Sequence, residues 1–243
     1  MRHVVLERWS RGTSGLHRRD PRAKAAALLI LLIVLGTARE GVVLLSAAFL
    51  VCLAAGFLSA RIPLGAALLR ASVVLPFAVP FAVLTLAAGD APRAQALVAK
   101  SYVSALAVLL LVATTPVPLL LAGLEAAGVP SFLLMVAQFL YRYLFVISEE
   151  ARRMRTAALA RGGSTGMAAA RGTRFRASAG AVGALFARSY SRAAAIHRAM
   201  LARGFDGRLP TLRAPRFGVA DAVFAAAAAA LSIAARIAAA RAA

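Results

Sequence analysis

The sequence has few acidic residues and almost no cysteine. Only 9 Asp and Glu stand against 29 Lys and Arg in 243 residues, and charged residues make up 16% of the chain. Soluble globular domains carry roughly 25% charged residues. Cys52 is the one cysteine, which excludes an intrachain disulfide and a cage of cysteine ligands around a metal. These shortages argue against an ordinary soluble domain.

Catalytic and phosphate-binding motifs are also missing. The chain has no H-E-x-x-H pattern, no nucleophile with a nearby base and no paired acids in a plausible membrane span. It has no G-x-x-x-x-G-K-[ST] loop, since the glycine-rich residues 162–166 lack the lysine that contacts phosphates. His3, His17 and His197 are too scattered for metal-ligand spacing. We therefore predict no catalytic residue, no metal site and no cofactor, and we do not expect an enzyme.

Apolar residues dominate the chain instead. They make up 61% of the sequence, and the mean hydropathy is +0.79. A helix needs about 20 apolar residues to span a bilayer. Apolar runs occupy residues 25–37, 42–58, 71–88, 102–115, 131–147 and 219–240. The composition predicts an all-α, multi-pass protein of the cell inner membrane, with about five to six transmembrane or membrane-embedded helices.

The distribution of positive charge orients these segments. Residues 1–24 are rich in arginine and precede the first apolar run, so they indicate a cytoplasmic tail rather than a signal peptide. Four spans and one partial segment before Glu149 would keep this tail on the same side as the basic residues that follow. The short run 25–37 is our choice for the partial segment. The predicted division is a tail (1–24), membrane helices (25–148), cytoplasmic coupling helices (149–216) and a last transmembrane helix (217–243).

Prolines divide the chain between two of the apolar runs. Thr114-Thr115-Pro116 precedes residues 119–127, and Gly128-Val129-Pro130 follows them. Proline removes a backbone donor and disfavours a helical residue before it. These signals predict a short separate helix over 119–127, at the cytoplasmic interface.

A basic block extends from residue 149 to residue 216. Its only acids are Glu149, Glu150 and Asp206, and positive charge of this density marks a cytoplasmic segment. Three- and four-residue spacings predict two helices joined by the glycine-rich residues 162–172, and Ser148-Glu149-Glu150 predicts a helix start. The basic residues of the block are Arg152, Arg153, Arg155, Arg161, Arg171, Arg174, Arg176, Arg188, Arg192, Arg198, Arg203, Arg208, Arg213 and Arg216.

Two tripeptides in the block have the same construction. Each has a helical run of small residues, an arginine in the last turn and then a glycine suited to a left-handed C-cap, in Ala160-Arg161-Gly162 and in Ala202-Arg203-Gly204. Such a tip projects a guanidinium, which stays charged and forks toward carboxylates, so it suits an acidic groove on another protein. A third copy, Ala170-Arg171-Gly172, lacks comparable flanks, and we interpret Arg171 as a solvated linker charge.

Arg142 lies near the middle of the apolar run 131–147, between Tyr141 and Tyr143. An arginine inside a membrane span is a functional candidate by default. Alternatively, Arg142 marks a shifted helix end and extends its charged group to the interface. The sequence leaves both interpretations open.

Motifs along most of the chain resemble a known family. They are residues 16–24, Thr114-Thr115-Pro116 with Gly128-Val129-Pro130, residues 141–154 and residues 199–207. This set resembles the transmembrane T component of energy-coupling factor (ECF) transporters, in particular the cobalt/nickel type called CbiQ. The resemblance implies a scaffold that links two cytoplasmic ABC ATPases to a membrane S component of the metal-binding type. It also implies that Arg161 and Arg203 dock into the ATPase pair, which would supply ATP hydrolysis.

Two other functions remain open at this stage. A shared T component could serve vitamin-type S components. A membrane-anchored basic protein could instead bind anionic lipid or nucleic acid by charge alone. We expect no nucleic-acid partner, because the basic residues lie between apolar runs rather than in a stripe interleaved with aromatics.

Overall fold

The computed structural model describes residues 9–10, 12–161, 171–207 and 217–242. All regular structure in these ranges is helical, which confirms the predicted all-α fold. The chain forms two compact units: unit 1 comprises Met1–Ala127 and Arg213–Ala243, and unit 2 comprises Gly128–Leu212.

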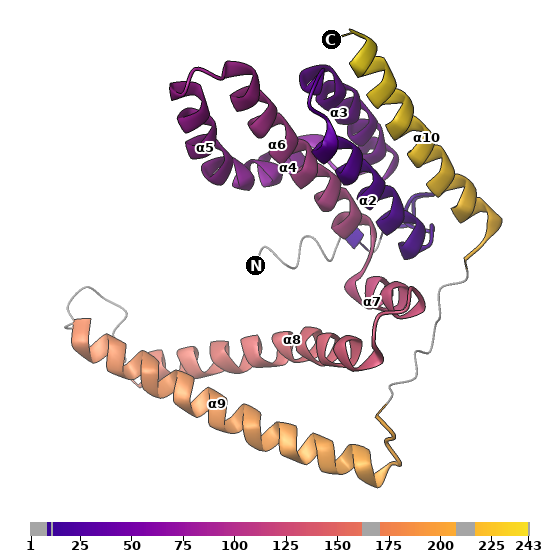
Figure 1. Ribbon diagram of the computed structural model, residues 1–243. Helices are drawn as coiled ribbons and strands as arrows, with labels where there is room; N and C mark the ends of the chain where they lie inside the picture. The colour runs from indigo at the N-terminus through magenta and orange to yellow at the C-terminus, as the bar shows by residue number, and fades with distance from the viewer. Residues whose placement is uncertain (1–8, 11, 162–170, 208–216, 243) are drawn as a thin grey trace. The chain divides into compact units, whose positions relative to one another are not determined.

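Unit 1 is a bundle of helices from both ends of the chain. In Figure 1, α10 packs against α2 and α3, α3 packs against α6, and α5 forms a hairpin with α6. The helices are α2 (Pro21–Thr37), α3 (Val42–Ser59), α4 (Leu64–Ala71), the short 3-10 turn η1 (Ser72–Val74), α5 (Leu75–Ala87), α6 (Ala91–Thr114), α7 (Val117–Ala126) and α10 (Val219–Ala242). The short α7 confirms the helix predicted between the prolines.

The core of unit 1 lies where α2, α3 and α6 meet. Leu35, Leu45, Phe57 and Val103 are each no more than 1% exposed. Burying a large aliphatic or aromatic side chain in this way stabilises a soluble fold by about 1.5–3 kcal/mol, but in lipid close packing supplies the preference instead. Helices of unit 1 also leave large apolar side chains exposed, among them Phe77 and Phe81 on α5.

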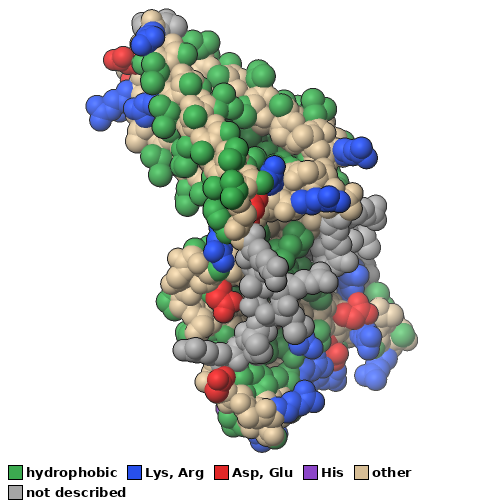
Figure 2. All heavy atoms as spheres, turned by 90° about the vertical axis from the view of Figure 1, so that its right-hand side faces the viewer, with side chains coloured by type: hydrophobic (Ala, Val, Ile, Leu, Met, Phe, Trp, Pro, Cys, Tyr) green, Lys and Arg blue, Asp and Glu red, His purple; other side chains and the backbone are tan. Residues whose placement is uncertain are grey.

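Five helical segments in the described ranges are long and apolar enough to cross a membrane. They are Val42–Ser59, Leu64–Ala87, Ala91–Thr114, Ser131–Ala160 and Val219–Arg241. The upper part of Figure 2, which is unit 1, is largely covered by apolar side chains, with charged side chains toward its two ends. This surface suits a lipid environment, and the protein is a multi-pass membrane protein.

Cationic side chains from two neighbouring helices cap the C-terminal end of α2. Lys100 Nζ on α6 donates to the carbonyl oxygens of Gly36 and Ala38 at 3.2 and 2.6 Å. Arg236 on α10 donates to the Val34 carbonyl at 3.3 Å and to the hydroxyl of Thr37. The last carbonyls of a helix have no partner within the helix, and the negative end of its dipole attracts cations. These side chains therefore stabilise a helix that ends inside the bundle.

Gly41 allows α3 to begin close to the end of α10. Its φ is +59°, and a Cβ atom at this position would lie 2.4 Å from the Ala239 carbonyl oxygen. Neither the backbone conformation nor the available space suits another residue.

We expect Gly41→Ala to lower the free energy of unfolding by about 2 kcal/mol, because it combines left-handed strain with a clash against backbone. Gly36→Ala is the matched control, since nothing lies within 4 Å of a Cβ at that position of α2. Thermal unfolding in detergent measures both variants. Equal unfolding midpoints for the two variants would show that position 41 does not require glycine.

Unit 2 consists of two long helices, α8 (Ser131–Ala160) and α9 (Arg171–Ala202). The prediction of a helix start at Ser148 was wrong, because α8 runs through this point without a break. Glu149 and Glu150 instead form ion pairs on its surface, Glu149 with Arg153 at 3.5 Å and Glu150 with Arg188 at 2.6 Å. The predicted domain boundary at residue 149 thus falls inside α8, so the apolar residues 131–147 belong to the same compact unit as α9.

Candidate functional site

Arg203 occupies the C-cap of α9. Gly204 follows with a φ of +77°. The Gly204 amide donates to the Leu201 carbonyl at 3.0 Å, and the Phe205 amide donates to the Met200 carbonyl at 3.1 Å. This pair of bonds is the Schellman motif, and it confirms the left-handed glycine cap predicted from the sequence. Arg203 is therefore held at the end of a rigid helix with an exposed side chain.

Arg161 occupies the equivalent position on α8. Its amide donates to the Ala157 carbonyl at 3.2 Å, and its φ and ψ of −89° and 17° end the helix. The Arg161 side chain is exposed, as is that of Ala160 before it. Gly162, the last residue of this predicted tip, lies outside the described residues. The sequence placed both arginines in the last helical turn, but each lies one position beyond the last helical residue.

The two arginine caps lie at opposite ends of the helix pair. Two contacts show that α8 and α9 run antiparallel. Glu150 pairs with Arg188, and the last turn of α9 faces the first half of α8. Nineteen residues of α8 separate Arg161 from Arg142, which stands opposite Arg203, and this corresponds to roughly 28 Å along the helix. One small binding site on a partner cannot contact both caps.

An open groove of about 390 Å³ lies between α8 and α9, where the two helices diverge in Figure 1. Arg142 from α8 and Arg203 from α9 both line it. Its walls are otherwise apolar or uncharged: Gln138, Phe139, Tyr143, Ile196, Ala199 and Met200. The structure thus brings together two arginines that the sequence singled out on separate grounds.

Arg142 has an exposed side chain that lies 6.0 Å from the centre of the Tyr143 ring. This distance is at the outer limit of a cation–π contact. Within the described ranges, no carboxylate of the chain forms an ion pair with Arg142 or Arg203. Neither guanidinium group is therefore neutralised by an acid of the described residues.

A buried polar cluster in unit 1 was missed by the sequence analysis. Lys24 is 6% exposed, and its Nζ donates to the Thr114 carbonyl at 3.0 Å, to Thr115 Oγ1 at 3.1 Å and to the His17 carbonyl at 3.3 Å. Its ammonium therefore connects the start of α2 to the end of α6. The sequence feature that could have indicated this cluster is the position of Lys24 directly before the apolar run 25–37.

Asp221 extends this cluster to α10. Its Oδ1 accepts from the Asp20 amide at 3.0 Å and lies 4.0 Å from the Arg19 guanidinium, and its Oδ2 accepts from the Gly218 amide at 3.1 Å. Asp20 in turn caps α2, since its carboxylate accepts from the Arg22 amide at 2.8 Å. The residues before α2 are thereby fixed to α6 and α10 at one end of unit 1.

Glycine lets α7 pack tightly against this same end. A Cβ at Gly123 would lie 3.0 Å from Pro21 Cβ and 3.6 Å from Arg22 Cγ. Contact this close joins α7 to the first turn of α2. α7 is connected through residues 127–130 to α8, so the chain passes directly from unit 2 to this contact.

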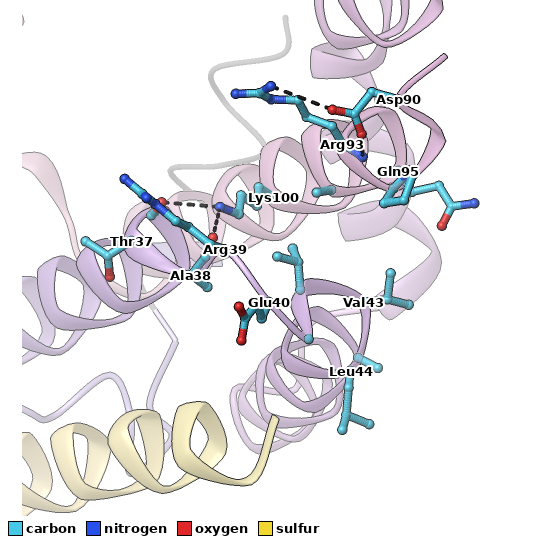
Figure 3. A pocket seen from close by; sticks show the side chains of 16 residues that line it. Thr37, Ala38, Arg39, Glu40, Val43, Leu44, Asp90, Arg93, Gln95 and Lys100 are labelled. Atoms are coloured by element: carbon cyan, nitrogen blue, oxygen red, sulfur yellow. Dashed lines mark hydrogen bonds and ion pairs between the residues drawn. The ribbon is translucent and has the colours of Figure 1, made fainter. Parts of the chain in front are cut away.

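A larger depression, of about 1330 Å³, opens at the turn between α2 and α3 and along the first half of α6. Figure 3 shows Lys100 directed at the backbone end of α2 and Arg93 directed at Asp90. The Asp90 side chain also accepts from the Arg93 amide at 3.1 Å and caps α6. These charged groups are therefore engaged in completing helix ends rather than arranged around a ligand.

Two comparisons with known proteins agree on the family. The model of the family CbiQ, described as cobalt transport protein, matches residues 12–212. The cobalt transport protein CbiQ of Rhodobacter capsulatus is 34% identical over 120 residues, which cover 49% of this chain and 48% of that protein. The match therefore spans about half the length of this curated relative. Because the family model covers most of the chain, including both arginine-capped helices, the chain belongs to the CbiQ family of cobalt transport proteins.

Proposed function

We propose that this protein is the transmembrane T component of an ECF-type importer. It passes ATP-driven motion from two cytoplasmic ABC ATPases to a membrane S component that binds the substrate. The observation that carries the proposal is the pair of arginine caps at opposite ends of α8 and α9. Two exposed guanidinium groups on rigid helix ends suit two separate acidic surfaces, one on each ATPase subunit.

In this proposal α8 lies along the cytoplasmic surface, although its length and composition would allow a span. If residues 131–147 crossed the bilayer, the end of α9 that faces them would enter the hydrocarbon with Arg192, Arg198 and Arg203. Each arginine at the centre of a bilayer costs at least about 2.5 kcal/mol. Arg142 would add to this cost from α8 itself. A surface position removes the penalty and leaves both caps in water.

A surface position for α8 requires α2 to cross the membrane fully, in place of the partial segment expected for residues 25–37. At 1.5 Å per residue its 17 residues extend about 26 Å, close to the hydrocarbon thickness of about 30 Å. Lys100 and Arg236 bind the carbonyls at its end, as a helix that ends in the bilayer needs. Crossings by α2, α3, the segment Leu64–Ala87 and α6 would return the chain to the side of its basic N-terminus, as the positive-inside rule requires.

The packing of α7 supplies a path for the coupling. A displacement of α8 by the ATPases pulls on α7, which contacts the start of α2 through Gly123. Lys24 and Asp221 then join that point to α6 and α10. Motion at the coupling helices would thereby reach most of unit 1 as a rigid body.

We propose cobalt or nickel as the transported substrate, on the strength of the family. The metal would bind to the S component, because this chain supplies no clustered ligands in its described ranges. A vitamin-type S component remains the alternative, and the identity of the S component that assembles with the chain decides between them.

Reconstitution tests the proposal. The chain is purified together with an ABC ATPase pair and an S component of the metal-binding type, placed in liposomes and supplied with radioactive cobalt. We expect ATP-dependent uptake only when all components are present. Uptake that is unchanged when this chain is omitted would contradict the proposal. If the chain assembles instead with an S component that binds a vitamin, the coupling role stands and the transported substrate is a vitamin and not a metal.

A further inference from the structure

We infer that the groove between α8 and α9 receives an acidic segment of the partner ATPase, with Arg142 as a second contact beside Arg203. This inference rests on the proposed function and specifies the surface that one of the two docking sites uses. It assigns a binding role to Arg142.

Charge complementarity supports an acidic occupant. Arg142 and Arg203 approach the same groove from different helices, and no acidic residue of the described chain lines it. The nearest acids on α8, Glu149 and Glu150, are already paired with Arg153 and Arg188. Two guanidinium groups in one groove repel each other unless an anion lies between them. A carboxylate of the partner would satisfy both.

The shape and the walls of the groove favour a protein segment over a lipid headgroup. About 390 Å³ accommodates a few side chains. Phe139, Tyr143, Ile196 and Met200 are each half-buried in the walls, and they offer aromatic and aliphatic contacts beside the two charges. Aromatic residues and arginine around one pocket are typical of the residues that dominate binding energy at protein interfaces.

The rigid neighbours of both arginines support the same inference. Arg203 is fixed by the Schellman cap, and Arg142 lies within a continuous helix. The ion pair between Arg188 and Glu150 holds the two helices together where they approach each other. The groove therefore exists before the partner binds, which lowers the entropy cost of binding.

The test measures binding of the purified ATPase pair to the full chain in nanodiscs made of zwitterionic lipid. We expect Arg142→Gln to weaken binding roughly tenfold, as loss of a charge-assisted contact predicts, and Arg142→Lys to have a smaller effect. Arg192→Gln on α9 is the control, because Arg192 is exposed and does not line the groove. The double variant with Arg203→Gln should lose less than the product of the single effects, since both arginines contact one acidic segment.

The possible outcomes distinguish failure of this inference from failure of the proposed function. If Arg203→Gln weakens binding while Arg142→Gln matches Arg192→Gln, the groove is not the site and the coupling role stands. If neither Arg142→Gln nor Arg203→Gln weakens binding, this inference and the proposed function both fail. An effect of Arg142→Gln that appears only in nanodiscs containing phosphatidylglycerol would assign the groove to a lipid headgroup and overturn the inference.

Discussion

Replacing Arg203 with lysine is expected to weaken binding of the ATPase pair roughly 30-fold, and Arg161→Lys should have an effect of similar size. A central arginine at an interface contributes about 2 kcal/mol or more, which corresponds to this factor. Lysine keeps the charge but loses the planar fork that binds a carboxylate through two parallel hydrogen bonds. Because both side chains are exposed caps, the substitutions should leave the fold intact. Binding to immobilised chain in detergent measures the effect.

Arg171→Ala provides the matched control for the two caps. Arg171 belongs to the third Ala-Arg-Gly copy and is the first residue of α9, not a helix C-cap. We expect this variant to bind the ATPases as the unaltered protein does. Binding by simple charge predicts a different pattern, in which the two lysine variants lose little and Arg171→Ala resembles any other loss of one charge. Equal effects at all three positions would rule out specific docking by the caps.

Replacing Lys24 with methionine is expected to destabilise unit 1 by about 3 kcal/mol. The ammonium makes three hydrogen bonds, and bonds to a charged group contribute about 1.5–3 kcal/mol each. Methionine removes these bonds but also removes the cost of burying a charge, which is several kcal/mol. The difference leaves a net loss, because the carbonyls of His17 and Thr114 lose a partner inside the protein. Thermal unfolding in detergent would show a midpoint lower by several degrees.

Arg93→Met is the control for Lys24. Arg93 also pairs with an acid, Asp90, at 3.6 Å, but its side chain is 76% exposed. Exposed ion pairs contribute about 0–1 kcal/mol, so the unfolding midpoint should hardly change. If Lys24→Met unfolds at the same temperature as Arg93→Met, the cluster does not hold α2, α6 and α10 together.

The membrane character and the helix caps could be predicted because they depend on local sequence. Apolar runs of sufficient length predicted the helices of unit 1, and prolines predicted α7. A small-residue run followed by arginine and glycine predicted the left-handed glycine cap at Gly204, which the hydrogen bonds of Gly204 and Phe205 confirm. Each of these signals spans no more than one helix or turn.

The extent of α8 was harder to predict, because its surroundings change along its length. The apolar run ends at Ile147 and the acids at Glu149 and Glu150 resemble a helix start. The helix continues to Ala160 instead, and Glu150 pairs with Arg188 of α9. This partner lies 38 positions away, so the local pattern could not reveal the role of Glu150.

The groove and the buried cluster depend on contacts between distant parts of the chain. Lys24 bonds to residues 90 and 91 positions away, and Asp20 bonds to Asp221 across 201 positions. Arg142 and Arg203 share a groove only because α8 and α9 run antiparallel. A single sequence shows each of these residues but not which of them meet.

The most direct test of the coupling role is crosslinking from the two caps. In a Cys52→Ser background, Ala160→Cys and Ala202→Cys place one thiol beside each arginine, and Ala179→Cys on the exposed surface of α9 is the control. With a short bifunctional reagent in the assembled transporter, we expect positions 160 and 202 to crosslink to ATPase subunits, and a chain with both cysteines to capture two subunits at once. Crosslinking at neither position, or no more than at position 179, would contradict the coupling role.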